Sequence, residues 1–239
     1  HSLLLASSNP AVLAYDPAFS YEVAHIVRDG LERMYGGDGD VLEGENVFYY
    51  LTVYNEPYVQ PAEPENLDVD GLLRGIYRFL PSATEEGSQV RLLASGVALP
   101  WAVRARELLA EQWGVGAEVW SVTSWGELRR DGVAAEHHNL VHPDAEPRVP
   151  YVSRALGENG PAVVAVSDWM RAVPDQIRQW VPARFTTLGT DGFGRSDYRR
   201  VLRDHFEVGA LDGAAPDLVV VAGVRQADFH VTLRNFGGG

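Results

Sequence analysis

The stretch VRLLASGVALPWAVRARELLAEQW, residues 90–113, joins a short apolar run to a longer segment with helical periodicity. Residues 90–95 predict a strand, because a short apolar run bounded by a glycine fits a buried strand. The residues that follow place apolar side chains three and four positions apart, which predicts an amphipathic helix. Its apolar face consists of Leu99, Ala102, Val103, Leu109, Ala110 and Trp113. A strand followed by a helix is the unit from which parallel sheets are built.

The same alternation continues along the chain after this unit. Further strands are predicted at residues 118–122, 161–166 and 185–188. A broken helical stretch is expected after the first of them, and Ser167 is predicted to cap the helix after the second. Pro174 lies inside that helix and predicts a kink or a restart. Ser196 is predicted to cap a last helix, with an apolar face of Tyr198, Val201, Leu202 and Phe206. These elements predict an α/β fold of three layers, with a mostly parallel sheet covered on both faces.

The first 55 residues predict the end of a second α/β unit. Asp16 and Pro17 suit the start of a helix, which should end near Gly36. Its apolar positions are Val23, Ile26, Val27, Leu31 and Met34. Residues 47–54, VFYYLTVY, predict a strand buried on both faces, because polar positions do not alternate in this run. Residues 55–70 then hold three prolines among carboxylates, which predicts an extended linker.

The composition excludes several classes of function. The chain has 239 residues with no cysteine and no lysine, so disulfides, thiolate nucleophiles, Schiff bases and Walker-type phosphate loops are excluded. Its formal net charge of −13 disfavours nucleic acid and anionic membrane surfaces as partners. No apolar run approaches the roughly 18 residues that a membrane span needs. We therefore expect neither a nucleic-acid nor a membrane partner.

A glycine-rich cluster from Gly189 to Ser196, GTDGFGRS, lies where a strand meets the start of a helix. Backbone N–H groups at such a place can hold an anion, and Arg195 could assist. Asp191 would repel a phosphate, however, so a structural turn is the favoured interpretation of this cluster. The sequence leaves an effector site at this cluster as an open alternative.

Histidines in this sequence are candidates for metal ligands or catalytic bases. His138 and His142 have the i, i+4 spacing of zinc sites on helices, but Pro143 ends the helix at once, which favours a polar surface turn. His25 and His205 lie within predicted helices and are interpreted as structural. The six tryptophans fall on apolar faces, so packing in the core or at a subunit interface is favoured over a ligand cage.

Several stretches together resemble one enzyme family. They are His1-Ser2, Tyr15-Asp16-Pro17, GLERMY at 30–35, VFYY at 47–50, RGIY at 74–77, SVTS at 121–124, PRVPY at 147–151 and LGTDGFGRSD at 188–197. They resemble the C-terminal portion of the homodimeric, acetyl-transferring pyruvate dehydrogenase decarboxylase component, one of the transketolase-like thiamine diphosphate enzymes. The resemblance covers residues 1–223, and we expect the chain to be part of a longer protein.

This resemblance implies a division of the chain. Residues 1–55 would be the C-terminal end of the middle, pyrimidine-binding type domain, and residues 56–88 a linker and crossover. Residues 89–223 would be a transketolase-like C-terminal domain, followed by an unmatched tail at 224–239. The resemblance also favours a helix for residues 218–222, where periodicity alone leaves strand and helix open.

The resemblance also implies partners and chemistry for the parent enzyme. These are thiamine diphosphate and Mg²⁺ as cofactors, pyruvate as substrate, a second copy of the subunit in a homodimer, and the dihydrolipoyl acetyltransferase core, in the cytoplasm. The domain that binds diphosphate and metal would lie outside this chain, so the chain alone is expected to hold neither cofactor. His1 alone matches a family active-site position, the histidine of an Asp-Gly-His-Ser motif. An imidazole beside the pyruvate carbonyl oxygen can donate a hydrogen bond or transfer a proton.

The leading hypothesis is thus a non-catalytic, structural or dimer-forming region of a pyruvate dehydrogenase. Two alternatives stay open. One is an independent dimerisation or effector-binding module, and the other is part of a different transketolase-like enzyme that acts on sugar phosphates or other 2-oxo acids.

Overall fold

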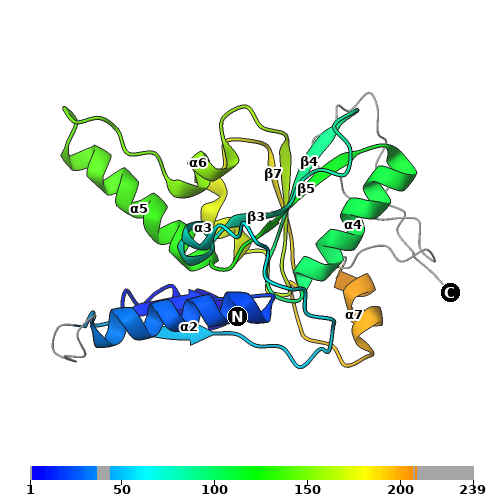
Figure 1. The fold of residues 1–239 in the computed structure, drawn as a ribbon, viewed down its shortest axis with the longest axis horizontal. Helices are drawn as coiled ribbons and strands as arrows, with labels where there is room; N and C mark the ends of the chain where they lie inside the picture. The colour runs from blue at the N-terminus through cyan, green and yellow to red at the C-terminus, as the bar shows by residue number, and fades with distance from the viewer. Residues whose placement is uncertain (1, 37–43, 207, 209–239) are drawn as a thin grey trace.

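The computed structural model describes residues 2–36, 44–206 and 208, and these form two sheets (Figure 1). The first sheet belongs to a small N-terminal unit. Its elements are α1 (Ser2–Ala6), β1 (Val12–Tyr15), α2 (Ser20–Tyr35) and β2 (Phe48–Leu51). The two strands pair in parallel, and α2 lies between them in the sequence. This unit is called the N-terminal unit below.

The second sheet has five strands in the order β3-β5-β4-β6-β7. Strand β3 pairs antiparallel with β5, and the other three pairs are parallel, so the predicted mostly parallel sheet is confirmed. The elements of this unit are α3 (Val69–Arg74), β3 (Tyr77–Leu80), β4 (Gln89–Ala94), α4 (Ala98–Trp113), β5 (Gly116–Ser121), α5 (Trp125–Val141), α6 (Tyr151–Leu156), β6 (Ala162–Val166), the 3₁₀-helix η1 (Pro174–Trp180), β7 (Phe185–Leu188) and α7 (Arg199–Phe206). It is called the five-stranded unit below.

Helices cover both faces of this sheet, and Figure 1 shows α4 and α5 on opposite sides of it. Alternate residues of β4 point to opposite faces. Leu92 packs in one hydrophobic cluster with Leu99 of α4, whereas Leu93 packs in a second cluster with Leu128 of α5. Burial on both sides explains why residues 90–95 are almost continuously apolar.

The strand order creates a crevice at the carboxyl end of the sheet. The chain runs from β4 through α4 to β5 on one side of β4, and then crosses to form β6 and β7 on the other side. The carboxyl ends of β4 and β6 therefore lie at the point where the order reverses. In open α/β sheets this is where ligands usually bind.

The structure corrects two predictions for the N-terminal unit. The strand predicted at 47–54 is present as β2 but spans only four residues, and its predicted burial on both faces is wrong, because Phe48 is 51% exposed. Within the described chain β2 pairs only with β1, which leaves part of its surface uncovered. The helix also begins at Ser20, with Phe19 rather than Asp16 at the N-cap position. The end of this helix near Gly36 is confirmed.

Further differences concern the five-stranded unit. The broken helix expected after residue 122 is the continuous, 17-residue α5, capped by the Ser124 hydroxyl, which accepts a bond from the Glu127 N–H (3.0 Å). Ser167 accepts from a nearby backbone N–H without starting a helix, and Ser196 lies three residues before α7. The restart at Pro174 is confirmed, since this proline begins η1. Strands β1 and β3 were not predicted, and the helix expected at 218–222 lies outside the described residues.

Candidate functional site

The crevice between β4 and β6 is filled by a carboxylate of the N-terminal unit. Asp16, directly after β1, is 1% exposed. Its Oδ1 accepts hydrogen bonds from Thr52 Oγ1 (2.5 Å) and Tyr54 OH (2.6 Å). Its Oδ2 accepts from Ser95 Oγ (2.6 Å), after β4, and from Trp169 Nε1 (3.1 Å), after β6. Asp16 thus occupies the position where an α/β sheet of this order usually holds a ligand.

The backbone around Asp16 is fixed as well. The Asp16 N–H donates to the Thr123 carbonyl (2.7 Å), and the Asp16 carbonyl accepts from the Gly96 N–H (3.0 Å). Gly96 has a φ of +52°, and a Cβ there would lie 2.6 Å from the Tyr54 ring. Only glycine suits this position, because it combines a left-handed conformation with a close approach. The turn after β4 is therefore shaped to receive Asp16.

A second carboxylate of the N-terminal unit, Glu22 of α2, enters the five-stranded unit beside β5 and is wholly buried. Its Oε1 accepts from Ser121 Oγ (2.6 Å) and Tyr77 OH (2.7 Å). Its Oε2 accepts from the backbone N–H groups of Ala18 (2.6 Å) and Phe19 (3.0 Å). Glu22 therefore caps its own helix with one oxygen and binds the neighbouring sheet with the other.

Burial raises the pKa of both carboxyls, and the surrounding donors oppose this effect. A buried carboxylate is tolerated only when its oxygens are hydrogen-bonded, and both meet this condition with four donors each. We define Asp16, Glu22 and their donors as the carboxylate junction. The groups of the junction bond to one another and not to an open site. The junction therefore serves to attach the N-terminal unit to the five-stranded unit.

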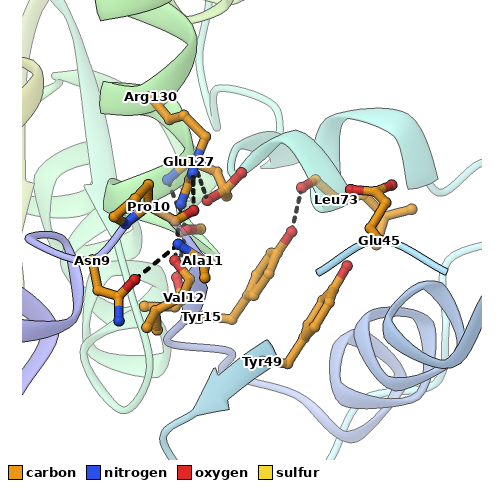
Figure 2. A network of polar contacts seen from close by, with 12 residues as sticks. Asn9, Pro10, Ala11, Val12, Tyr15, Glu45, Tyr49, Leu73, Glu127 and Arg130 are labelled. Atoms are coloured by element: carbon orange, nitrogen blue, oxygen red, sulfur yellow. Dashed lines mark hydrogen bonds and ion pairs between the residues drawn. The ribbon is translucent and has the colours of Figure 1, made fainter. Parts of the chain in front are cut away.

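A third attachment point lies at the other end of β1 (Figure 2). Arg130 of α5 donates to the carbonyls of Pro10 (2.6 Å) and Val12 (2.9 Å), and its Nε donates to Glu127 (3.0 Å). Burial raises the pKa of Glu127, and the charge of Arg130 opposes this. Because backbone carbonyls need hydrogen-bond partners, these contacts let the arginine fix the start of β1 to α5.

Tyr15 completes the attachment of β1 (Figure 2). Its hydroxyl donates to the Leu73 carbonyl at 2.8 Å, and its ring stacks on Tyr49 of β2 with centroids 5.7 Å apart. Tyr15 and Ile26 lie in the same hydrophobic cluster as Leu92 of β4. The two units therefore share one core.

The remaining carboxyl end of the sheet, beyond β6 and β7, opens into a cavity of about 380 Å³. Asp168 follows β6 and Thr190 follows β7. The other lining residues are Tyr54, Asn55, Glu56, Gly192, Phe193, Gly194, Arg199, Leu202, Arg203, Phe206 and Val208. In contrast to Asp16, the Asp168 carboxylate accepts no hydrogen bond from any described residue. We call this space the α7 cavity.

Within the described chain, the site residues predicted from the sequence do not come together in one site. His1 lies outside the described residues. Four residues of the cluster from 189 to 196 line the α7 cavity, namely Thr190, Gly192, Phe193 and Gly194. Asp191 instead pairs with Arg171 (2.6 Å), and Arg195 is exposed. His138 and His142 stack with ring centroids 4.5 Å apart at the exposed end of α5. In the described parts of the chain, no group of three or more histidine, cysteine or acidic side chains could hold a metal ion.

Sequence reasoning missed both junction carboxylates. The sequence pattern places Asp16 at a helix start, and it singles out no role for Glu22. One signal could have found Asp16, since it directly follows an apolar run, LAY at 13–15, and side chains after buried strands often lie at functional edges.

Comparison with known families identifies the five-stranded unit. Residues 75–209 match the model of the transketolase-like TK C-terminal domain. The chain belongs to this family. Residues 1–61 match a second model, the pyruvate dehydrogenase E1 component middle domain. The resemblance stated from the sequence is thereby confirmed.

Curated relatives of this transketolase-like chain are pyruvate dehydrogenase E1 components. It is 57% identical over 231 residues to the protein of Mycolicibacterium smegmatis, covering 94% of this chain and 24% of that relative. It is 57% identical over 233 residues to the Mycobacterium tuberculosis protein and 47% identical over 213 residues to the Escherichia coli K12 protein, which cover 98% and 88% of this chain. The chain spans about a quarter of the length of these relatives, 24% and 23% for the last two.

Solved structures share the transketolase-like fold at low identity. Transketolase from Leishmania mexicana superposes with a TM-score of 0.55 at 18% identity, over 87% of this chain and 25% of that one. Transketolase from Campylobacter jejuni gives 0.55 at 16% identity, over 87% and 26%. These likenesses show the fold alone.

Proposed function

We propose that this chain is the carboxyl-terminal part of an enzyme that carries out thiamine diphosphate-dependent oxidative decarboxylation of pyruvate and acetyl transfer to lipoyl groups. The observation that carries the proposal is the 57% identity to pyruvate dehydrogenase E1 over nearly the whole chain. In the parent enzyme the chain would comprise the end of the middle domain, residues 1–55, a linker and crossover at 56–88, and the C-terminal domain at 89–223, before the tail at 224–239. We place the parent enzyme in the cytoplasm, as the family resemblance implies. Among the described residues, none of the helices has the length and apolar character of a membrane span.

We assign His1 as the residue of this chain that acts at the substrate, where its imidazole would donate a hydrogen bond or a proton to the pyruvate carbonyl oxygen. Thiamine diphosphate would supply an electron sink for decarboxylation in the parent enzyme. The described residues do not fit that cofactor with its Mg²⁺, because they include no group of three acidic or histidine side chains that could hold a metal.

The proposed role of the described residues is structural, and the carboxylate junction supports this role. Two carboxylates of the junction bind the N-terminal unit to the five-stranded unit. These bonds would hold the middle domain of the parent in a fixed orientation. The test is pyruvate-dependent reduction of an artificial electron acceptor with thiamine diphosphate and Mg²⁺ added. We expect no turnover from this chain and turnover from the full-length parent. Robust turnover from the chain alone would overturn the proposal.

A second copy of the subunit is the partner that the described surface supports best. Helix α2 carries Val27, Leu31 and Tyr35 at intervals of four residues on one side, with exposures of 44%, 52% and 51%. An exposed apolar stripe at this spacing fits packing against another helix. Sedimentation at several concentrations tests it: a Leu31→Glu substitution should shift a dimer toward monomer, whereas a strict monomer before substitution would contradict it. Through the full parent, the acetyltransferase core would be the further partner.

A further inference from the structure

The α7 cavity lies beside the carboxylate junction but differs from it in one respect: its charges are not all paired. Arg203 and Glu56 form a two-pronged ion pair, with Arg203 Nη1 2.8 Å from Glu56 Oε1. This pair is neutral as a whole and is largely buried, with Arg203 at 8% exposure. This ion pair forms one wall of the cavity.

Two opposite charges remain on the cavity walls. Asp168 accepts no hydrogen bond and forms no ion pair with a described residue, and it is only partly open to solvent. Arg199 donates to the neutral Asn55 amide oxygen and forms no ion pair within the described chain. Both residues line the α7 cavity. Burial raises the pKa of Asp168, and the charges of Arg203 and, to a smaller extent, Arg199 oppose this effect. Counting only the described residues, the cavity therefore offers one anion and one cation without an ion-pair partner.

The rest of the lining is apolar on the helix side. Leu202 and Phe206 of α7, with Phe193 and Val208, provide this part of the wall. The volume of about 380 Å³ is near the lower end of the roughly 300–1,000 Å³ of ligand sites, which suits a small metabolite and not a dinucleotide. Its place at the carboxyl ends of β6 and β7 is the edge at which ligands bind to parallel sheets.

We propose that the α7 cavity binds a small zwitterion, a free α-amino acid with an apolar side chain. The ammonium group pairs with Asp168, the carboxylate pairs with Arg199, and the side chain packs against Leu202 and Phe206. Each unpaired charge of the cavity then gains a partner of opposite sign, and the ligand gains charge-assisted hydrogen bonds at both ends. Binding of such a ligand can be measured on the 239-residue chain without catalytic turnover.

Calorimetric titration of the 239-residue chain with L-leucine tests this proposal. We expect a dissociation constant of about 0.1–1 mM, typical of a small ligand held by two ionic contacts. Two analogues each lack one charge: 4-methylpentanoate has no ammonium group, and 3-methylbutylamine has no carboxylate. Each should bind at least about tenfold more weakly than L-leucine. Absence of L-leucine binding at about 10 mM, or equal binding of either analogue, would overturn the proposal.

Variants identify the groups involved. Asp168→Asn and Arg199→Gln should each weaken L-leucine binding by about tenfold or more, because each removes one charged partner. Asp204→Asn and Arg200→Gln are the matched controls, since both residues are exposed on the same helix and do not line the cavity. These controls should leave the affinity unchanged. Equal affinity in Asp168→Asn, with its fold confirmed by circular dichroism, would contradict the proposed ammonium contact.

Discussion

Asp16 and Asp168 lie at the same edge of the five-stranded sheet and have opposite surroundings. Asp16 is wholly buried and accepts four hydrogen bonds from side chains of both units. Asp168 faces the α7 cavity and accepts none from the described residues. Both carboxyls have raised pKa values, and burial is the largest cause for each. The difference between them therefore lies in the number of donors and not in burial alone.

This comparison shows how one sheet edge is divided between structure and binding. Where β4 and β6 end, the N-terminal unit supplies its own carboxylate and the crevice is filled. Where β6 and β7 end, a similar carboxylate is left without donors and a cavity remains. Substitutions at the two positions should therefore have opposite effects on stability.

The largest effect is expected for Asp16→Ala, which leaves four donors without their acceptor. We expect a loss of about 3–5 kcal/mol in the free energy of unfolding, because each buried donor that is left without an acceptor costs about 1–3 kcal/mol and the costs add only in part. Chemical denaturation followed by tryptophan fluorescence measures it. Asp144→Ala, at an exposed loop position, should change stability by less than about 0.5 kcal/mol. A cost of Asp16→Ala no larger than that of this control would contradict the account.

Glu22→Gln should have the next largest effect. The amide NH₂ cannot accept a hydrogen bond, so it must oppose either the two backbone N–H groups or the hydroxyls of Tyr77 and Ser121. We expect a loss of about 2–3 kcal/mol in the same denaturation experiment. The matched control is Glu32→Gln, which changes an exposed residue on the same helix. If both variants are equally stable, Glu22 does not join the two units.

Trp169→Phe tests a single donor of the junction. It keeps a ring but removes the Nε1–H that donates to Asp16 (3.1 Å) and to the Tyr54 hydroxyl (3.2 Å). The expected cost is about 1–2 kcal/mol. Trp113→Phe, which removes an indole without a hydrogen bond to a described residue, should cost less. The reverse order would show that ring packing outweighs the bond to Asp16.

The smallest effect, of opposite sign, is expected for Asp168→Asn. Burial and the nearby carboxylates of Asp16 and Glu56 raise the pKa of Asp168 above its ordinary value of 3.8. A raised native pKa contributes stability that is complete below 3.8 and is lost as pH rises through the native value. The variant should therefore be about 0.5–1 kcal/mol more stable than the parent chain at pH 7. This gain should vanish as pH falls toward 4, and a gain that persists there would contradict the assignment to ionised Asp168.

Local sequence predicted those elements whose signal lies within a few residues. Strand β7 and the ends of α2 and α4 follow from apolar runs and glycines that are close in sequence. The local pattern predicts a helix cap at Asp16, because Pro17 directly after it suits the first turn of a helix. The donors that determine its role, Ser95 and Trp169, lie 79 and 153 residues away. Such contacts depend on the strand order, which local patterns do not specify.

Hydrogen exchange is the most direct test of the claim that the carboxylate junction joins the two units. Peptides that cover β1 and α2 are compared between the parent chain, Asp16→Ala and Asp168→Asn, under conditions in which all three are folded. We predict that Asp16→Ala lowers protection in β1, in α2 and in the turns at Ser95 and Trp169 together, whereas Asp168→Asn leaves these segments unchanged. Unchanged protection of β1 and α2 in Asp16→Ala would contradict the claim.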